Sequence, residues 1–213
     1  MNIETVDHYR QLLAQVDTWF SDCLRAHGDK IACREGCSGC CRGLFDITLL
    51  DARLLQQGFR KLSAALQRDV LARVDVRLQQ LQQQWPDFRH PFILNRLPHD
   101  QWLNMPEDDL TPCPLLGKDG RCLVYDYRPL TCRLHGLPHI DVSSEVFCDS
   151  CCTLNFVDCD PLELVELRGN FKHLFQREVE LLSQFSLHLT GRSQVELDTF
   201  IPTALLIDFD HLF

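Results

Sequence analysis

The sequence contains no apolar run long enough to cross a membrane. Its first residues, "MNIETVDHYRQLLAQ", also lack the basic start, the apolar stretch and the small-residue cleavage site of a secretory signal. These two absences predict a soluble, cytoplasmic protein that has no membrane partner.

Basic residues are too few for a general nucleic-acid-binding protein. The chain has 21 Lys and Arg residues against 30 Asp and Glu residues, which gives a formal net charge of -9. Such a chain repels a phosphate backbone unless positive charge is concentrated on one face. We therefore expect no general binding of nucleic acid.

Motifs of the common enzyme classes are missing as well. The chain has no phosphate-binding glycine loop, no dinucleotide fingerprint and no recognisable hydrolytic triad. No nucleophile can be paired with a base, so the sequence names no catalytic residue, and enzyme activity stays an open question.

Helical periodicity dominates what is present. Apolar residues recur at helical spacing over residues 5–27, 62–85 and 160–190. Another helix is predicted to start at Thr48, which together with Asp51 three residues later resembles a capping arrangement. With 45% hydrophobic residues in 213, the chain can bury one sizeable core. We predict a mainly α protein, a single compact helical domain over residues 1–213 whose cysteine-rich loops are organised by metal.

The ends of the expected elements are marked by particular residues. Pro86 should end the second helix, whereas Asp160 with Pro161 should begin the third one as N-cap and first helical residue. The proline-broken segment 86–114 predicts irregular structure with one short helix or strand. The apolar tail, "TFIPTALLIDFDHLF", should pack on the core.

Cysteine is the one residue type in clear excess. Cys23 stands alone within the first predicted helix and is interpreted as a small buried hydrophobe. In a reducing cytosol, clustered cysteines more often bind metal or do redox chemistry than form disulfides. The other eleven form three groups, namely Cys33, Cys37, Cys40 and Cys41; Cys113, Cys122 and Cys132; and Cys148, Cys151, Cys152 and Cys159.

The first group is spaced so that its thiols can converge. Gly36 and Gly39 ease the turn of the backbone between the cysteines. Several thiolates repel each other unless a cation compensates, and a bound metal removes that conflict. Metal binding is therefore favoured over plain core packing or a disulfide framework.

Two motifs resemble a known family. Cys33-x3-Cys37-x2-Cys40-Cys41, followed by "RGLFDITLLDARLL", and then "CPLLGKDGRCLVYDYRPLTCR" from Cys113 to Arg133 are similar to the YkgJ-type cysteine-cluster family, described as zinc- or iron-chelating domains. The motifs cover about a quarter of the chain. The resemblance implies metal chelation, often as an iron–sulfur cluster, through Cys33, Cys37, Cys40, Cys41, Cys113, Cys122 and Cys132.

The third group, 148–159, lies outside this resemblance. "CDSCCTLNFVDC" repeats the C-x2-C-C form, so we predict that it binds metal too, with redox thiols or local packing as the alternatives. Eleven clustered cysteines exceed what one four-ligand site can use, and adjacent side chains usually point apart. The segments 33–41, 113–132 and 148–159 thus predict two nearby centres, or one multinuclear centre with bridging thiolates.

The identity of the metal is left open between iron and zinc. The spacing C-x3-C-x2-C is more typical of iron–sulfur binding, such as a 4Fe-4S cluster, than of zinc ribbons. Radical S-adenosylmethionine enzymes share this spacing, but they typically have an aromatic residue where Gly39 stands, and the surrounding pattern here is helical.

Positive charge accompanies the cysteines. Arg128 and Arg133 flank Cys132 and would stabilise a net-negative thiolate centre, unless they form ordinary surface ion pairs. His135 and His139 are interpreted as loop or supporting residues rather than ligands, because cysteine is so abundant.

Three functions agree with these observations. We favour an iron–sulfur protein whose cluster serves electron transfer, sensing or structure, with an unidentified protein or redox partner. The first alternative is a zinc-binding structural, interaction or metal-handling protein. The second is a thiol-redox protein, which would need reactive thiols of low pKa.

Overall fold

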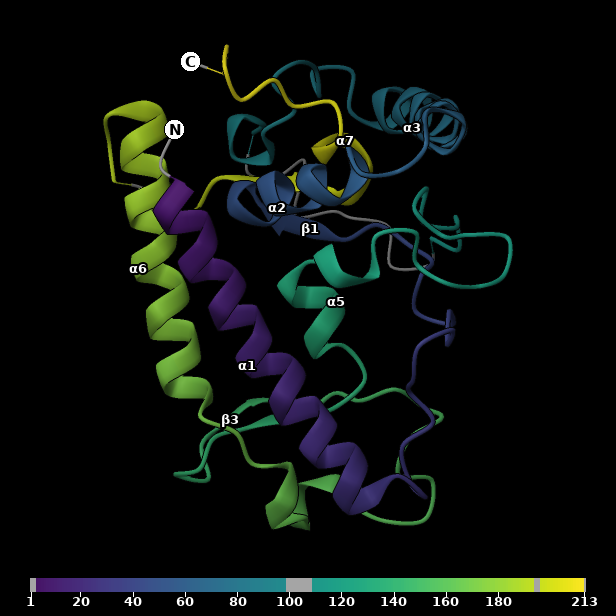
Figure 1. The fold of residues 1–213 in the computed structure, drawn as a ribbon, viewed down its shortest axis with the longest axis vertical. Coiled ribbons are helices and arrows are strands. Elements are labelled where there is room, and N and C mark those ends of the chain that lie inside the picture. Colours follow the sequence, from purple (N-terminus) through teal and green to yellow (C-terminus); the bar gives the residue numbers. More distant parts are fainter. Residues whose placement is uncertain (1–2, 99–108, 194–195, 213) are drawn as a thin grey trace.

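A computed structural model describes residues 3–98, 109–193 and 196–212 (Figure 1). Within these ranges helices dominate and strands are short, so the predicted mainly α class is confirmed. No helix of the described residues is long and apolar enough to span a bilayer. The helices are α1 (Ile3–His27), α2 (Leu49–Phe59), α3 (Ala64–Gln84), α5 (Leu130–Leu134), α6 (Phe171–Thr190) and α7 (Ile201–Ala204).

Two small antiparallel pairs of strands tie distant segments together. β1 (Asp46–Thr48) pairs with β4 (Asp198–Phe200), and β2 (His139–Ile140) pairs with β3 (Val146–Cys148). The first pair joins the segment after the first cysteine group to the C-terminal tail. Short 3-10 turns occupy Leu94–Arg96, Tyr125–Tyr127, Pro161–Glu163 and Val165–Leu167.

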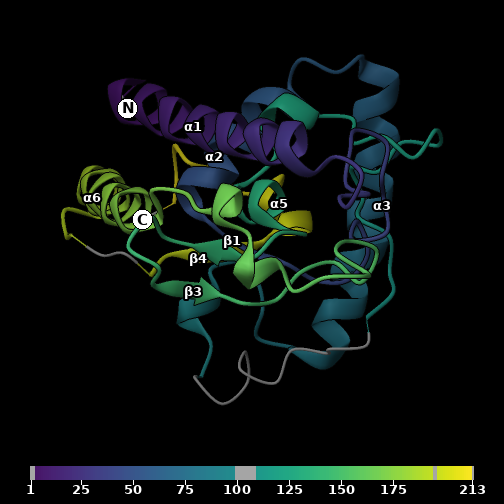
Figure 2. The same ribbon diagram turned by 90° about the horizontal axis from the view of Figure 1, so that it is seen from below.

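The short helix α5 occupies the centre of the molecule. α1 packs along α6 and also against α5, while α2 packs against α7. Figures 1 and 2 show α5 between α6 on one side and α3 on the other. Because α5 carries Cys132, the surrounding helices fix the position of that thiol.

Local signals placed several boundaries correctly. The Thr48 hydroxyl accepts a hydrogen bond from the Asp51 backbone N–H at 3.1 Å, as the predicted cap requires. α3 ends at Gln84, two residues before Pro86. On the apolar side of α3, Val70, Val74 and Leu81 are buried, whereas Leu66 in the first turn is exposed.

The predicted helix over residues 160–190 is wrong at its start. Asp160 does act as an N-cap, but only for the 3-10 turn at Pro161–Glu163, and α6 begins at Phe171. The Gly169 N–H donates to the Ile140 carbonyl of β2 at 2.9 Å. In a helix the same N–H would donate to the carbonyl four residues earlier in the chain. A long-range hydrogen bond therefore overrides the local helical pattern.

The C-terminal tail packs on the core, as predicted. Phe200 is fully buried, and Ile201, Ala204 and Ile207 are almost completely buried. The tail thereby closes the apolar face of α2. Part of the segment 86–114 lies outside the described residues, and its described part contains one 3-10 turn, at Leu94–Arg96.

A buried carboxyl group links three helices. The Asp51 carboxylate on α2 accepts hydrogen bonds from the Tyr9 hydroxyl on α1, at 2.9 Å, and from the Leu130 N–H of α5, at 3.1 Å. Burial raises the pKa of Asp51 to about 6, although these two hydrogen bonds oppose the shift. Asp51 therefore anchors the start of the helix that carries Cys132.

Glu178 makes the stability of the fold depend on pH. Burial, and then the charges of Asp51 and Asp198, raise the pKa of Glu178 to about 8. The folded chain thus retains a proton that the unfolded chain releases near pH 4.5. This stabilisation is complete below about pH 4.5 and is lost as the pH rises through about 8, by at most about 1.4 kcal/mol per pH unit.

Glu178→Gln should therefore flatten the dependence of the free energy of unfolding on pH between about 5 and 8, as measured by urea denaturation. Glu180→Gln is the matched control, since Glu180 is exposed on the same helix. Identical pH profiles for wild type and Glu178→Gln would contradict the assignment.

Candidate metal centre

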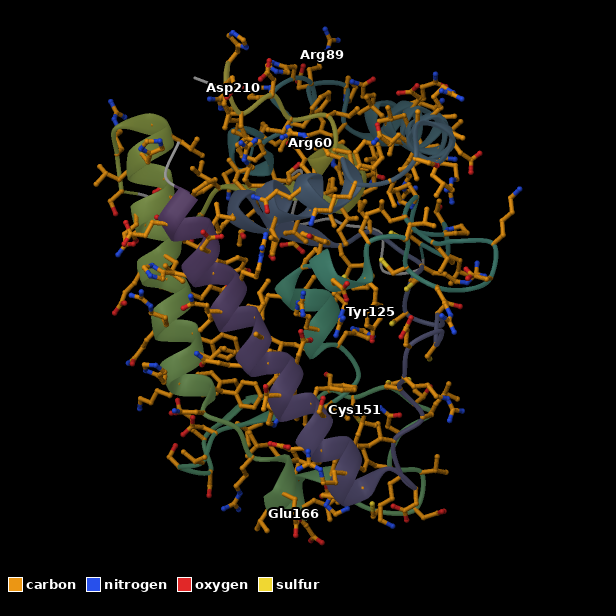
Figure 3. All side chains as sticks on the ribbon, viewed as in Figure 1. Arg60, Arg89, Tyr125, Cys151, Glu166 and Asp210 are labelled. Atoms are coloured by element: carbon orange, nitrogen blue, oxygen red, sulfur yellow. The ribbon has the colours of Figure 1, made fainter. Side chains whose placement is uncertain are left out.

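One cavity collects cysteines from two distant parts of the chain. It has a volume of about 130 Å³ and lies among α2, α5 and the cysteine-rich loops. Tyr125, labelled in Figure 3, lines it beside α5. Its lining includes the seven cysteines implied by the family resemblance, which are Cys33, Cys37, Cys40, Cys41, Cys113, Cys122 and Cys132.

Two consecutive turns shape the first cysteine segment. The Cys37 N–H donates to the Arg34 carbonyl at 2.9 Å, and the Cys41 N–H donates to the Ser38 carbonyl at 3.1 Å. Gly36 has a φ of 90°, a left-handed conformation that favours glycine, whereas Gly39 does not lie in this region. The predicted role of glycine in the turn is thus confirmed at Gly36 only.

Backbone pairing brings the second cysteine segment to the first. The Cys113 N–H donates to the Cys41 carbonyl at 2.9 Å, next to a bridge between Arg42 and Pro112. A second bridge, between Leu116 and Cys122, folds the 113–122 loop back on itself. These contacts hold Cys41, Cys113 and Cys122 in one region, and α5 adds Cys132.

Four of these thiols lie within electrostatic range of one another. The pKa of Cys41 is lowered, chiefly because the Cys40 thiol donates a hydrogen bond to it, while the charges of Cys113, Cys122 and Cys132 act in the opposite direction. Burial raises the pKa of Cys132, and Cys113 and Cys122 raise it further. Burial likewise raises the pKa of Cys113 to about 11, with a contribution from Cys122. All six pairs among the four thiols therefore interact.

Two of the sulfurs have backbone groups nearby. The backbone groups of Leu115 and Leu116 lie near the Cys113 sulfur, and that of Val124 lies near the Cys122 sulfur; the Leu116 N–H itself donates to the Cys113 carbonyl at 3.0 Å. Backbone N–H groups near a sulfur stabilise thiolates and tune thiolate-bound metal. They lower the pKa of both cysteines, against the larger effect of burial, which raises it.

Arg128 and Arg133 both line the cavity and share one carboxylate. Arg128 pairs with Asp17 of α1 at 2.8 Å, and Arg133, whose side chain is only 4% exposed, pairs with the other oxygen of Asp17. The charge of Arg128 also lowers the pKa of Cys122, although burial raises it overall. The two arginines therefore line the cavity with the thiols, but both are ion-paired with Asp17, a partner that sequence analysis missed.

The third cysteine group lies apart from the cavity lining. Cys151, labelled in Figure 3, and Cys159 pack against an apolar cluster that contains Cys23 and Phe156. Cys152 instead lies near Cys33, which lines the cavity. A Cβ atom built on Gly136 would be 3.8 Å from the Cys152 Cβ and 2.7 Å from the Cys33 sulfur. The structure thus separates members of this group that the sequence treats as equivalent.

Cys23 and the two histidines have distinct surroundings. Cys23 is fully buried in α1, which confirms its interpretation as a small hydrophobe, and burial raises its pKa to about 12. His135 lines the cavity, where burial lowers its pKa. His139 shares a hydrogen bond of 3.1 Å with the Leu134 carbonyl, so one of its ring nitrogens already has a protein partner.

The donor set agrees chemically with a bound metal. All twelve cysteines are free thiols. No three His, Cys, Asp or Glu side chains of the described ranges already stand in the close geometry of a metal site. The thiols instead surround a space of about 130 Å³, roughly ten times what one water molecule requires on this measure.

Comparison with known proteins found no matching family, no similar curated protein and no similar solved structure. The interpretation of the site therefore depends on its own residues and on the two cysteine motifs.

Proposed function

We propose that this protein binds an iron–sulfur cluster through Cys41, Cys113, Cys122 and Cys132, and that the cluster serves electron transfer or sensing. The observation that carries the proposal is the convergence of these four thiols on one cavity, where each lies within electrostatic range of the other three. Iron–sulfur clusters are commonly held by four cysteine thiolates. A bound cluster supplies one-electron chemistry.

The surroundings of the four thiols support a redox role over a purely structural one. Cys132 is exposed to solvent through the cavity, although protein surrounds it on its other sides. Structural zinc sites are closed, with four ligands around one ion. Seven thiols around an accessible cavity, with N–H donors and arginines nearby, suit a cluster that exchanges electrons with a partner.

Metal analysis of the purified protein tests the proposal. The protein should be prepared without oxygen, and iron, zinc, acid-labile sulfide and the visible spectrum should be measured on one sample. We expect iron with an equal amount of sulfide and a broad visible absorption band. Zinc without sulfide would show a structural or metal-handling site and would remove the redox role. A protein that contained neither iron nor zinc would contradict the proposal altogether.

A further inference from the structure

We propose a second thiolate metal centre, beside the first, with Cys33, Cys37, Cys40 and Cys152 as its ligands. This inference rests on the proposed function, because it assigns the cavity cysteines that the first centre leaves unused. Cys33, Cys37 and Cys40 have the C-x3-C-x2-C spacing that is typical of iron–sulfur binding. A fourth thiol must then come from another segment, and the fold brings Cys152 to this place.

A buried amide joins Cys33 to the segment that carries Cys152. The Asn155 side chain, which is 4% exposed, donates to the Cys33 sulfur at 3.2 Å and to the Gly136 carbonyl at 2.6 Å. Its oxygen accepts from the Ala32 N–H at 2.8 Å. An amide that donates to sulfur is the kind of outer contact that orients a thiolate ligand.

Gly136 leaves the space in which Cys33 and Cys152 meet. The Cys152 N–H donates to the Gly136 carbonyl at 3.1 Å, and Gly136 has a φ of 106°. A Cβ atom on this residue would be only 2.7 Å from the Cys33 sulfur, closer than real Cβ contacts allow. Glycine at this position therefore allows the left-handed backbone conformation and leaves space for the side chains of Cys33 and Cys152.

The charges at Cys33 agree with this set of ligands. Cys152, Cys37 and Cys40 all lie within electrostatic range of Cys33, and a cation among the four thiolates would relieve their repulsion.

Both cysteine doublets are divided in this arrangement. Cys41 is assigned to the first centre and Cys40 to the second, and the hydrogen bond from the Cys40 thiol to Cys41 places the two centres side by side at this doublet. Of the other doublet, Cys152 lies next to Cys33, whereas Cys151 packs against the apolar cluster around Phe156. Cys148, Cys151 and Cys159 neither line the cavity nor lie nearest to Gly136, so the proposal gives them no ligand role and narrows the eleven cysteines named by the sequence to eight.

The adjacent cysteines Cys151 and Cys152 provide a matched test. Wild type, Cys152→Ser and Cys151→Ser should be prepared without oxygen and compared for iron, zinc and sulfide per chain. We expect Cys152→Ser to retain about half of the wild-type metal and Cys151→Ser to retain all of it. Full metal content in Cys152→Ser, or equal losses in the two variants, would overturn the second centre.

Thiol labelling of wild type keeps the test decisive if Cys152→Ser does not fold. Iodoacetamide labelling, mapped by mass spectrometry, should modify Cys152 much faster after the metal is removed with a chelator, while Cys151 should react similarly in both samples. If the labelling rate of Cys152 were the same before and after removal of the metal, the second centre would be refuted. In that case the first centre would still stand if wild type contained metal and Cys122→Ser did not. If wild type contained no metal, both proposed centres would be refuted.

Discussion

Cys122→Ser should lose the metal of the first centre and unfold more easily, with a decrease in the free energy of unfolding of about 4 kcal/mol or more. Cys122 lies within electrostatic range of each of the other three proposed ligands. Serine is a poor ligand for iron or zinc in place of a thiolate. Because metal binding is coupled to folding, loss of one ligand reduces both metal content and stability.

Cys23→Ser is the control for this experiment. It makes the same chemical change in α1, where the thiol is fully buried in an apolar cluster. The new hydroxyl costs about 1–3 kcal/mol of stability through burial of a polar group, but the metal content should be that of wild type. Metal analysis after desalting, together with urea denaturation, separates the two effects. Equal metal retention in Cys122→Ser and Cys23→Ser would overturn the ligand assignment.

Asp17→Asn should lower the free energy of unfolding by about 2 kcal/mol, between the values typical of exposed and buried ion pairs. The Asp17 side chain is 40% exposed, but its partner Arg133 is 4% exposed and would retain a buried charge without a carboxylate. Arg133 also donates to the Arg128 carbonyl, at 3.0 Å, and to the Asp126 carbonyl, at 2.8 Å. Loss of the Asp17 carboxylate should therefore loosen the turn over residues 126–128, which Arg133 holds and which precedes Cys132.

This loosening should also weaken metal binding, by about tenfold, as is common when an outer contact of a metal site is removed. Competition with a chelator measures the affinity, and urea denaturation measures the stability. Asp22→Asn is the matched control, because Asp22 lies on the same helix and pairs with Arg25 on the exposed surface at 2.9 Å. Changes of similar size in the two variants would show that Asp17 has no special role at the cavity.

Features that depend on neighbouring residues could be predicted well. α1, the Thr48 cap and the end of α3 before Pro86 follow from periodicity, a hydroxyl at the N-cap and a missing N–H. Cys23 was separable from the other cysteines because it stands alone in an amphipathic helix. The seven cysteines of the two motifs do line one cavity, since short spacing and backbone pairing both act to bring them together.

Features that depend on distant contacts could not be predicted. Residues 160–170 have a good N-cap and apolar spacing, but the hydrogen bond from Gly169 to Ile140 prevents a helix there. Asp17 is one of many acidic residues in the sequence, and no local signal links it to arginines more than a hundred positions away. Asn155 likewise gains its importance only from contacts with Ala32, Cys33 and Gly136.

The sequence by itself determined the helical class and seven of the thiols that line the cavity, because periodicity and the spacing of thiols are properties of short segments. Only the tertiary structure decided how the thiols are divided. Cys152 lies next to Cys33 while its neighbour Cys151 packs against apolar residues. The two are chemically identical and adjacent in the chain, so that difference arises from segments that meet only when the chain folds.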